Sequence, residues 1–162
     1  MPWDYGSQHQ LRRWILERPE DVNADLLACN DALRGWASRI EWLSPRPDTD
    51  VELRDYAWTE IGLAAASPQE VGWWPKGGAV WDAVARVHGP DGQIGGIFLE
   101  AKGRAGELTS GGTKATEPAI TTIKSALADV KADLGVVPSE EWLMACYQPA
   151  NRLALLWYAR QR

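Results

Sequence analysis

The sequence predicts an α/β fold in which a small mixed β-sheet is flanked by helices. Two neighbouring apolar segments, residues 79–88 and 93–102, are typical of paired strands, and the turn sequence Gly89-Pro90-Asp91-Gly92 joins them. Before and after this hairpin, apolar residues recur at helical spacing over long stretches. A chain of 162 residues suits one structural domain with a substantial core.

The first part of the chain, residues 1–48, is expected to be a helical N-terminal extension. Apolar residues recur at helical spacing within residues 8–18, and Pro19 ends that stretch. A second helix is expected to follow and to continue through Trp42, because its apolar residues fit one helical face. The sequence Ser44-Pro45-Arg46-Pro47 then breaks the chain.

Residues 49–162 are expected to form the main core. Prolines, glycines and clusters of small polar residues divide this part of the chain into elements. The expected elements are, in chain order, a helix over 49–65, a short strand or extended entry over 70–75, the two strands of the hairpin, a helix over 117–133 that closes at Gly135, and a helix over 139–160 that Pro149 kinks.

Composition narrows the classes of function. The net charge is −5 and the pI is about 5.1, which argues against broad, non-specific binding to nucleic acid. A nuclease remains compatible with this charge because bound divalent cations can neutralise an acidic cleft. Cys29 and Cys146 match no metal-ligand spacing and are typical of free thiols in a reducing compartment. With no apolar run of transmembrane length and no signal-peptide pattern, we expect a cytoplasmic protein without membrane contact.

Three charged residues in the otherwise apolar strands indicate a chemical site. Side chains alternate between the faces of a strand, so Glu100 and Lys102 point the same way, and Asp82 can lie opposite them on the paired strand. Two carboxylates beside an ammonium suit Mg²⁺ or Mn²⁺, for which the backbone carbonyl of Ala101 is a further ligand. Such a cation activates water, while Lys102 can hold that water or the developing negative charge.

The order Trp81-Asp82 and then Glu100-Ala101-Lys102 on an apolar strand resembles the PD-(D/E)xK nuclease superfamily, which has the restriction-endonuclease-like fold. The resemblance implies a helix, a three-strand meander, a helix and a further strand. It also implies metal ligation by Asp82 and Glu100 and a catalytic role for Lys102. An acidic residue from the preceding helix joins the site in several branches, and Glu60 is placed for that role. The further strand would have to follow Arg162.

The chain also resembles, more closely, a group of uncharacterised prokaryotic proteins over roughly residues 55 to 160. This resemblance implies a nuclease-like fold without a settled activity. In the last of the matching stretches, Gln148 can line the cleft as an auxiliary catalytic residue or can cap backbone groups around Pro149. The matching stretches are Trp81-Asp82-Ala83-Val84-Ala85, Leu99-Glu100-Ala101-Lys102 and Tyr147-Gln148-Pro149-Ala150-Asn151-Arg152-Leu153-Ala154.

Structural interpretations of the same residues stay open at this point. Asp82 can form a structural salt bridge with Lys102 or Arg86, and Glu60 can be a solvated helix residue. The short acid-x-Lys pattern occurs again in Asp129-Val130-Lys131, on an expected helix where strand alternation does not apply. The short pattern alone therefore has little specificity, and its context on paired apolar strands carries the hypothesis.

The predicted function is that of a Mg²⁺-dependent endonuclease, a phosphodiesterase that hydrolyses DNA. The alternative is a non-catalytic module in which the nuclease fold and its Trp-rich helices bind a protein partner. A small-molecule phosphoesterase is a third possibility, and DNA is not distinguished from RNA. A sheet edge left open by a missing strand can pair with another chain, so we expect a homodimer.

Overall fold

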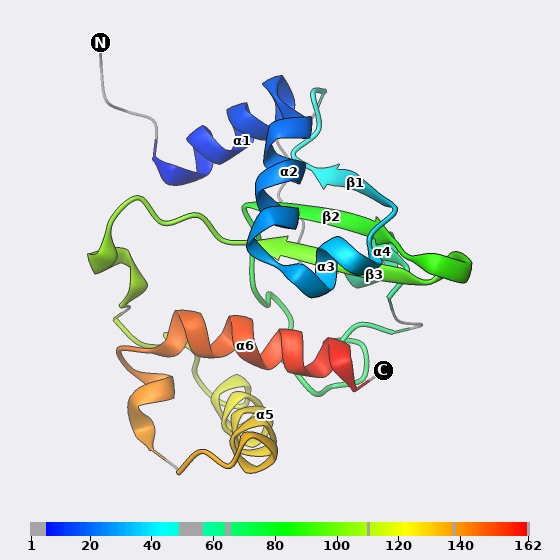
Figure 1. Cartoon of the computed structure of the whole chain (residues 1–162). Coiled ribbons are helices and arrows are strands. Elements are labelled where there is room, and N and C mark those ends of the chain that lie inside the picture. The colour runs from blue at the N-terminus through cyan, green and yellow to red at the C-terminus, as the bar shows by residue number, and fades with distance from the viewer. Residues whose placement is uncertain (1–5, 49–56, 64–65, 110, 138, 162) are drawn as a thin grey trace. The chain divides into compact units, whose positions relative to one another are not determined.

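The computed structural model describes residues 6–48, 57–63, 66–109, 111–137 and 139–161. Within these residues the chain has six α-helices and one three-stranded antiparallel sheet (Figure 1). The α/β class is therefore confirmed. The chain divides into two compact units. Unit 1 comprises residues 1–63 and 80–103, and unit 2 comprises residues 64–79 and 104–162.

Unit 1 contains the sheet, whose strands lie in the order β1-β2-β3. The predicted hairpin is confirmed, and its turn includes Asp91 in the left-handed region at φ 54°. The expected mixed sheet is wrong for the described residues, because β1 and β3 both pair with β2 in the antiparallel sense. The strands are β1 (Arg39–Ser44), β2 (Ala83–His88) and β3 (Ile94–Leu99).

Strand β1 corrects the expectation of a helix running through Trp42. Ile40 pairs with Val87 and Trp42 pairs with Ala85 across the ladder. The spacing of these apolar residues is compatible with one face of a helix and with the alternation of a strand. Pairing with β2 selects the strand. The expected strand at 70–75 is also wrong, since those residues form turns and bends, so the third strand comes from the N-terminal part of the chain.

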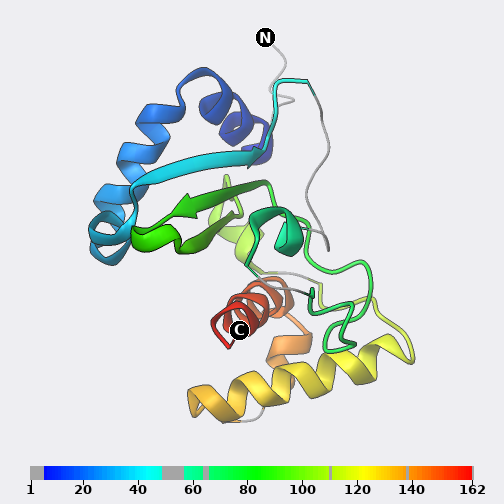
Figure 2. The ribbon, with the colours of Figure 1, turned by 90° about the vertical axis from the view of Figure 1, so that its right-hand side faces the viewer.

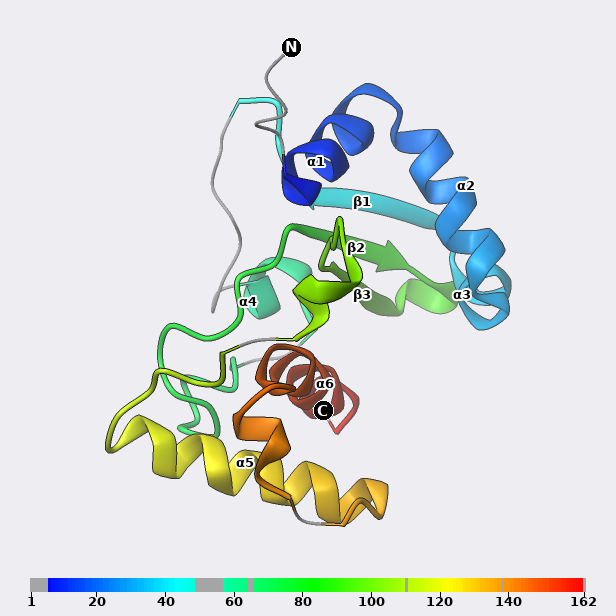
Figure 3. The same ribbon diagram turned by 90° about the vertical axis from the view of Figure 1, so that its left-hand side faces the viewer.

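Three helices cover one face of this sheet: α1 (Ser7–Glu17), α2 (Pro19–Cys29) and α3 (Asp31–Trp36) (Figure 3). The expected helix at 8–18 is thereby confirmed. Pro19 begins α2, where a proline costs no hydrogen bond. Ile15 and Val22 form a buried cluster with Ala83 of β2, and around it pack Leu11, Leu26, Trp42 and Leu99.

The opposite face of the sheet carries α4 (Ala57–Ile61), which is the described part of the helix expected over 49–65. The rest of that prediction lies outside the described residues. Trp58 of α4 lies 5.2 Å from Phe98 of β3 between ring centroids, and Trp81 lies 5.0 Å from the same ring. Both tryptophans are buried, so Trp58, Trp81 and Phe98 form an aromatic cluster that packs at this end of the hairpin.

Unit 2 is built around α5 (Ala119–Leu134) and α6 (Tyr147–Arg160), which cross each other (Figure 2). Gly135 ends α5 with φ +65°, as predicted. The expected kink at Pro149 is wrong, because α6 begins at Tyr147 and a proline in a first turn lacks only a hydrogen bond that no helix makes there. Two short 3₁₀ segments complete the unit, η2 (Ala105–Leu108) and η3 (Glu140–Leu143). Among the helices of the described residues, none has the length and apolar character needed to cross a membrane.

The end of α3 is joined to the hairpin through Trp36. Its indole Nε1 donates to the side chain of Gln93 at 3.1 Å, and its ring lies against Gly89 and Gly95. A Cβ atom at Gly89 would come within 2.3 Å of this ring. The close approach of the α3 end to the turn therefore depends on the missing side chain.

We predict that Gly89→Ala destabilises the protein by about 1–3 kcal/mol, because Trp36 must leave its position over the turn. Chemical denaturation monitored by circular dichroism measures this change. Gly35→Ala is the matched control, since a Cβ in that helical position meets no atom within 4 Å. Equal stability of Gly89→Ala and the wild type would contradict the packing described for Trp36.

Candidate functional site

The candidate site lies where the β2–β3 hairpin opens, at the end away from its turn. Asp82 directly precedes β2 at a bend, and Glu100 directly follows β3. The backbone N–H of Asp82 donates to the Leu99 carbonyl at 3.1 Å. The Asp82 carboxylate accepts the backbone N–H of Ala101 at 2.8 Å. Asp82 thus reaches the residue that separates Glu100 from Lys102.

Glu100 and Lys102 contact each other directly. The Lys102 ammonium donates to Oε1 of Glu100, and the two side chains are 21% and 18% exposed for Lys102 and Glu100. This contact agrees with the prediction that the two side chains share a side of the chain, but the expectation of a strand reaching residue 102 is wrong, because β3 ends at Leu99. The structure therefore brings three predicted site residues, Asp82, Glu100 and Lys102, to one end of the hairpin.

The backbone carbonyl of Ala101, predicted as a metal ligand, has a protein partner in this structure. Ser7, the first residue of α1, donates its hydroxyl hydrogen to this carbonyl at 3.0 Å. The contact joins residues 94 positions apart, so no local sequence signal could have revealed it. Ser7 is thus an additional residue of the site, and it ties the start of α1 to the Glu100-Ala101-Lys102 segment.

Glu60 has another partner within unit 1. Its carboxylate lies 3.8 Å from the guanidinium of Arg46, and both side chains are about half exposed. In the part of the chain that the structure describes, no group of three or more His, Cys, Asp or Glu side chains is arranged to hold a metal ion. Glu60 therefore does not complete a three-acid cluster with Asp82 and Glu100.

Gln148 belongs to a different unit from the rest of the predicted site. It lies in the first turn of α6, which is part of unit 2, whereas Asp82 and Glu100 lie in unit 1. The auxiliary role of Gln148 therefore stays a prediction.

The alternative partners considered for Asp82 are engaged elsewhere in the described structure. Lys102 pairs with Glu100. The Arg86 guanidinium donates to the carbonyls of Glu60 and Ile61 at the end of α4 and lies 3.4 Å from the Glu41 carboxylate. Arg86 therefore fastens α4 to the sheet, which is a structural role.

The second acid-x-Lys match lies on α5, as the helical interpretation predicts. The Asp129 carboxylate accepts the indole N–H of Trp73 at 3.1 Å, while the Lys131 ammonium donates to the Ser139 carbonyl. The two side chains thus serve separate contacts in unit 2.

A charged cluster on the β1–β2 ladder was not found from the sequence. The carboxylate of Glu41 lies 3.0 Å from Nε2 of His88, 3.3 Å from Arg39 and 3.4 Å from Arg86. The hydrogen bond with His88, together with the positive charges of Arg86 and Arg39, lowers the pKa of Glu41. The register of β1 on β2 creates the cluster, so a helical interpretation of residues 39–44 could not reveal it.

Comparison with protein-family models, with curated protein sequences and with solved structures finds no match to this chain. The chemistry of the site therefore rests on its own residues. The carboxylates of Asp82 and Glu100 and the carbonyl of Ala101 are hard oxygen donors of the kind that Mg²⁺ and Mn²⁺ prefer. The chemical type of these donors suits such a cation, and their arrangement in the described residues does not form a metal-holding cluster of three acidic, histidine or cysteine side chains.

We predict that Asp82→Ala destabilises the protein by about 1–3 kcal/mol, because it removes the acceptor of a half-buried backbone N–H at Ala101. Asp82→Asn keeps an oxygen at that place and should retain most of this free energy. Denaturant unfolding of both variants measures the difference. Identical losses in the two variants would show that the hydrogen bond to Ala101 contributes nothing.

We predict that the Glu41 cluster makes the folded state sensitive to acid. Because the pKa of Glu41 is lowered in the folded protein, its ionised form stabilises the fold above the unfolded-state pKa, and this contribution is lost as the pH falls through the lower folded value. The free energy of unfolding of Glu41→Gln should thus fall less steeply than that of the wild type between about pH 5 and pH 3. Asp25→Asn controls for the change in net charge, and parallel curves for wild type and Glu41→Gln would refute the prediction.

Proposed function

We propose that this protein is a divalent-cation-dependent phosphodiesterase that cleaves DNA, with its active site at the open end of the β2–β3 hairpin. The observation that supports this most is the hydrogen bond between the Asp82 carboxylate and the backbone N–H of Ala101. It joins an acidic side chain from one strand to the segment that carries Glu100 and Lys102 on the other. Two acids and one base thus belong to one short stretch at the end of the hairpin, and metal-assisted hydrolysis uses this combination of residue types.

The order of the elements supports the proposal in part. Helices α1, α2 and α3 come first, β1 follows, and helix α4 separates β1 from β2; β3 and then helix α5 come next. The resemblance to PD-(D/E)xK nucleases implies a helix, a meander of three strands and a helix, with the acids on the second and third strands. Helix α4 interrupts that meander, while Asp82 directly precedes β2 and Glu100 directly follows β3.

In this proposal each residue has a defined task. Asp82, Glu100 and the Ala101 carbonyl would hold Mg²⁺ or Mn²⁺, which when bound supplies a Lewis acid and an activated water. Lys102, which pairs with Glu100, would orient that water or neutralise charge on the phosphoryl oxygens. Glu60 and Gln148 are auxiliary candidates, and Ser7 would position the Ala101 carbonyl.

A non-catalytic interaction module is the competing function, and one observation favours it. Two polar groups of the site already have protein partners, because Lys102 binds Glu100 and Ser7 binds the Ala101 carbonyl. In such a module these contacts would have a structural role only, since they would hold together the segments at the end of the hairpin. Metal binding and cleavage distinguish the two functions.

We predict that Asp82→Asn abolishes Mn²⁺ binding measured by calorimetry and that Asp82→Asn and Lys102→Met each lower Mg²⁺-dependent cleavage of plasmid DNA by about 100-fold or more. Asp91→Asn is the matched control, since it removes the same charge from an exposed position in the turn of the same hairpin. It should bind Mn²⁺ and cleave DNA like the wild type.

Circular dichroism of each variant establishes that it is folded. If the folded wild type binds no Mn²⁺, or if Asp82→Asn and Lys102→Met cleave DNA at the wild-type rate, the proposed mechanism is wrong. A chelator must also stop the wild-type reaction, because the proposal assigns the cation an essential role.

A further inference from the structure

Unit 2 contains a hollow that is separate from the hairpin site. It has a volume of about 530 Å³ and lies between α5 and the segment formed by Val136, Ser139 and η3. One stripe of α5, at residues 124, 127, 128, 131 and 132, forms one wall together with Gly135, which ends the helix. These positions recur every three or four residues, so they lie on a single helical face. Most of the lining is apolar and includes Leu127, Val136 and Leu143.

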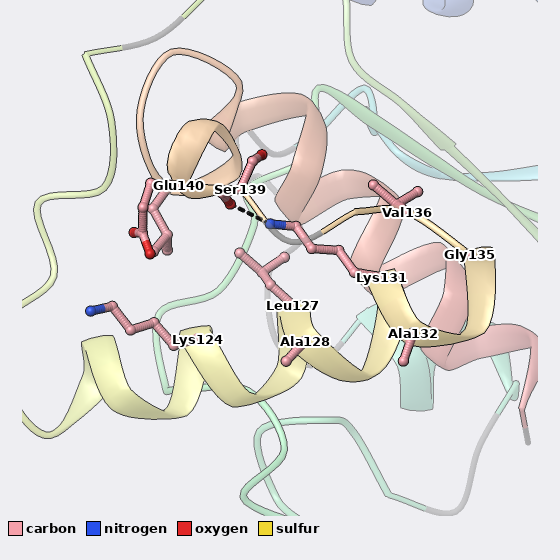
Figure 4. A pocket seen from close by; sticks show the side chains of 10 residues that line it. Lys124, Leu127, Ala128, Lys131, Ala132, Gly135, Val136, Ser139 and Glu140 are labelled. Atoms are coloured by element: carbon pink, nitrogen blue, oxygen red, sulfur yellow. Dashed lines mark hydrogen bonds between the residues drawn. The ribbon is translucent and has the colours of Figure 1, made fainter.

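A buried lysine lies in the wall of this hollow. Lys131 as a residue is only 8% exposed, although lysine is rarely buried without a counter-ion. Its ammonium donates to the Ser139 carbonyl and lies 5.0 Å from the centre of the Trp142 ring. Figure 4 shows the Lys131 ammonium directed from α5 across the hollow to Ser139.

The charge of Lys131 is only partly compensated by these contacts. An ammonium has three hydrogen-bond donors, and the Ser139 carbonyl takes one of them. In the described residues no carboxylate lies within ion-pair distance of Lys131, so its positive charge is balanced by a dipole and an aromatic face. A buried cation with spare donors in the wall of a hollow attracts an anionic group.

The rim of the hollow restricts the charge of the ligand. Lys124 and Glu140 lie at one end, and Gly135 and Val136 lie at the other (Figure 4). Two lysines and one glutamate leave a single net positive charge in the lining. A monoanion complements this charge, whereas a dianion would bring excess negative charge close to Glu140.

We propose that this hollow is a binding site for a small organic monoanion, a carboxylate on an apolar body. The carboxylate binds the ammonium of Lys131 with Lys124 nearby, and the apolar body packs on Leu127, Leu143 and Val136. Ligand sites of this volume are usually apolar with a few well-placed polar groups, as here. The proposal concerns unit 2 alone and does not rest on the proposed nuclease activity.

The test uses two probes that share an aromatic body and differ in charge, 2-naphthoate and 2-naphthamide. Calorimetry on the full chain should show 2-naphthoate binding at least about tenfold more tightly than 2-naphthamide, because a charge-assisted hydrogen bond is lost in the amide. In Lys131→Met, which keeps an unbranched side chain one atom shorter and removes the charge, the affinity for 2-naphthoate should fall by about tenfold or more. The affinity for 2-naphthamide should change little.

Lys114→Met is the control, because Lys114 is an exposed lysine of unit 2 outside the hollow. It should bind 2-naphthoate like the wild type. If Lys131→Met does not fold, the comparison of the two probes on the wild type still decides the matter. Absence of 2-naphthoate binding, equal affinity for both probes, or a Lys131→Met variant that binds 2-naphthoate like the wild type would overturn the proposal.

Discussion

The central strand β2 is the constraint on which the architecture of unit 1 depends. Its residues Ala83, Val84, Ala85 and Val87 are at most 1% exposed, so both of its faces must be covered and both of its edges must be paired. Helices α1 and α2 meet one face, α4 meets the other, and β1 and β3 take the two edges. Each of these elements therefore has its place because β2 is buried.

This burial also places the polar groups of unit 1. The first three residues of β2 are fully buried, and its polar contacts lie on either side of them, in the candidate site before Ala83 and in the Glu41 cluster from Arg86 onward. At one end Asp82 is held against the backbone of Ala101. Toward the other end Arg86 and His88 share the carboxylate of Glu41. Trp81 directly precedes Asp82, and both Trp81 and Trp58 pack against the ring of Phe98, so an aromatic cluster adjoins the first of these groups.

Lys102 and Lys131 both hold a positive charge away from full exposure to solvent, and the protein compensates the two charges in different ways. Lys102 is about one-fifth exposed and has a carboxylate partner two residues away, a pairing that strand alternation favours. Lys131 is more deeply buried and has a carbonyl and an indole ring as partners. Lys102 thus forms an ion pair with Glu100 close to a second acid, Asp82. Among the described residues Lys131 has no such ion pair, and it keeps its positive charge in the wall of the hollow in unit 2.

The sequence could predict those parts of the fold and site that local chemistry controls. The turn residues around Asp91 specify the hairpin, helical spacing specifies α1 and α5, and Gly135 specifies the end of α5. The contact between Glu100 and Lys102 was also predicted, although both residues lie beyond the end of β3.

Only the tertiary structure decided the features that need a distant partner. Residues 39–44 fit a helix and a strand equally, and the free edge of β2 selected the strand. The Glu41 cluster, the contact of Ser7 with Ala101 and the surroundings of Lys131 join residues brought together by folding. The local sequence determines where turns form and with which hydrophobic periodicity, helical or strand, a segment is compatible. Where a segment is compatible with both, pairing and packing with distant segments decide which structure forms.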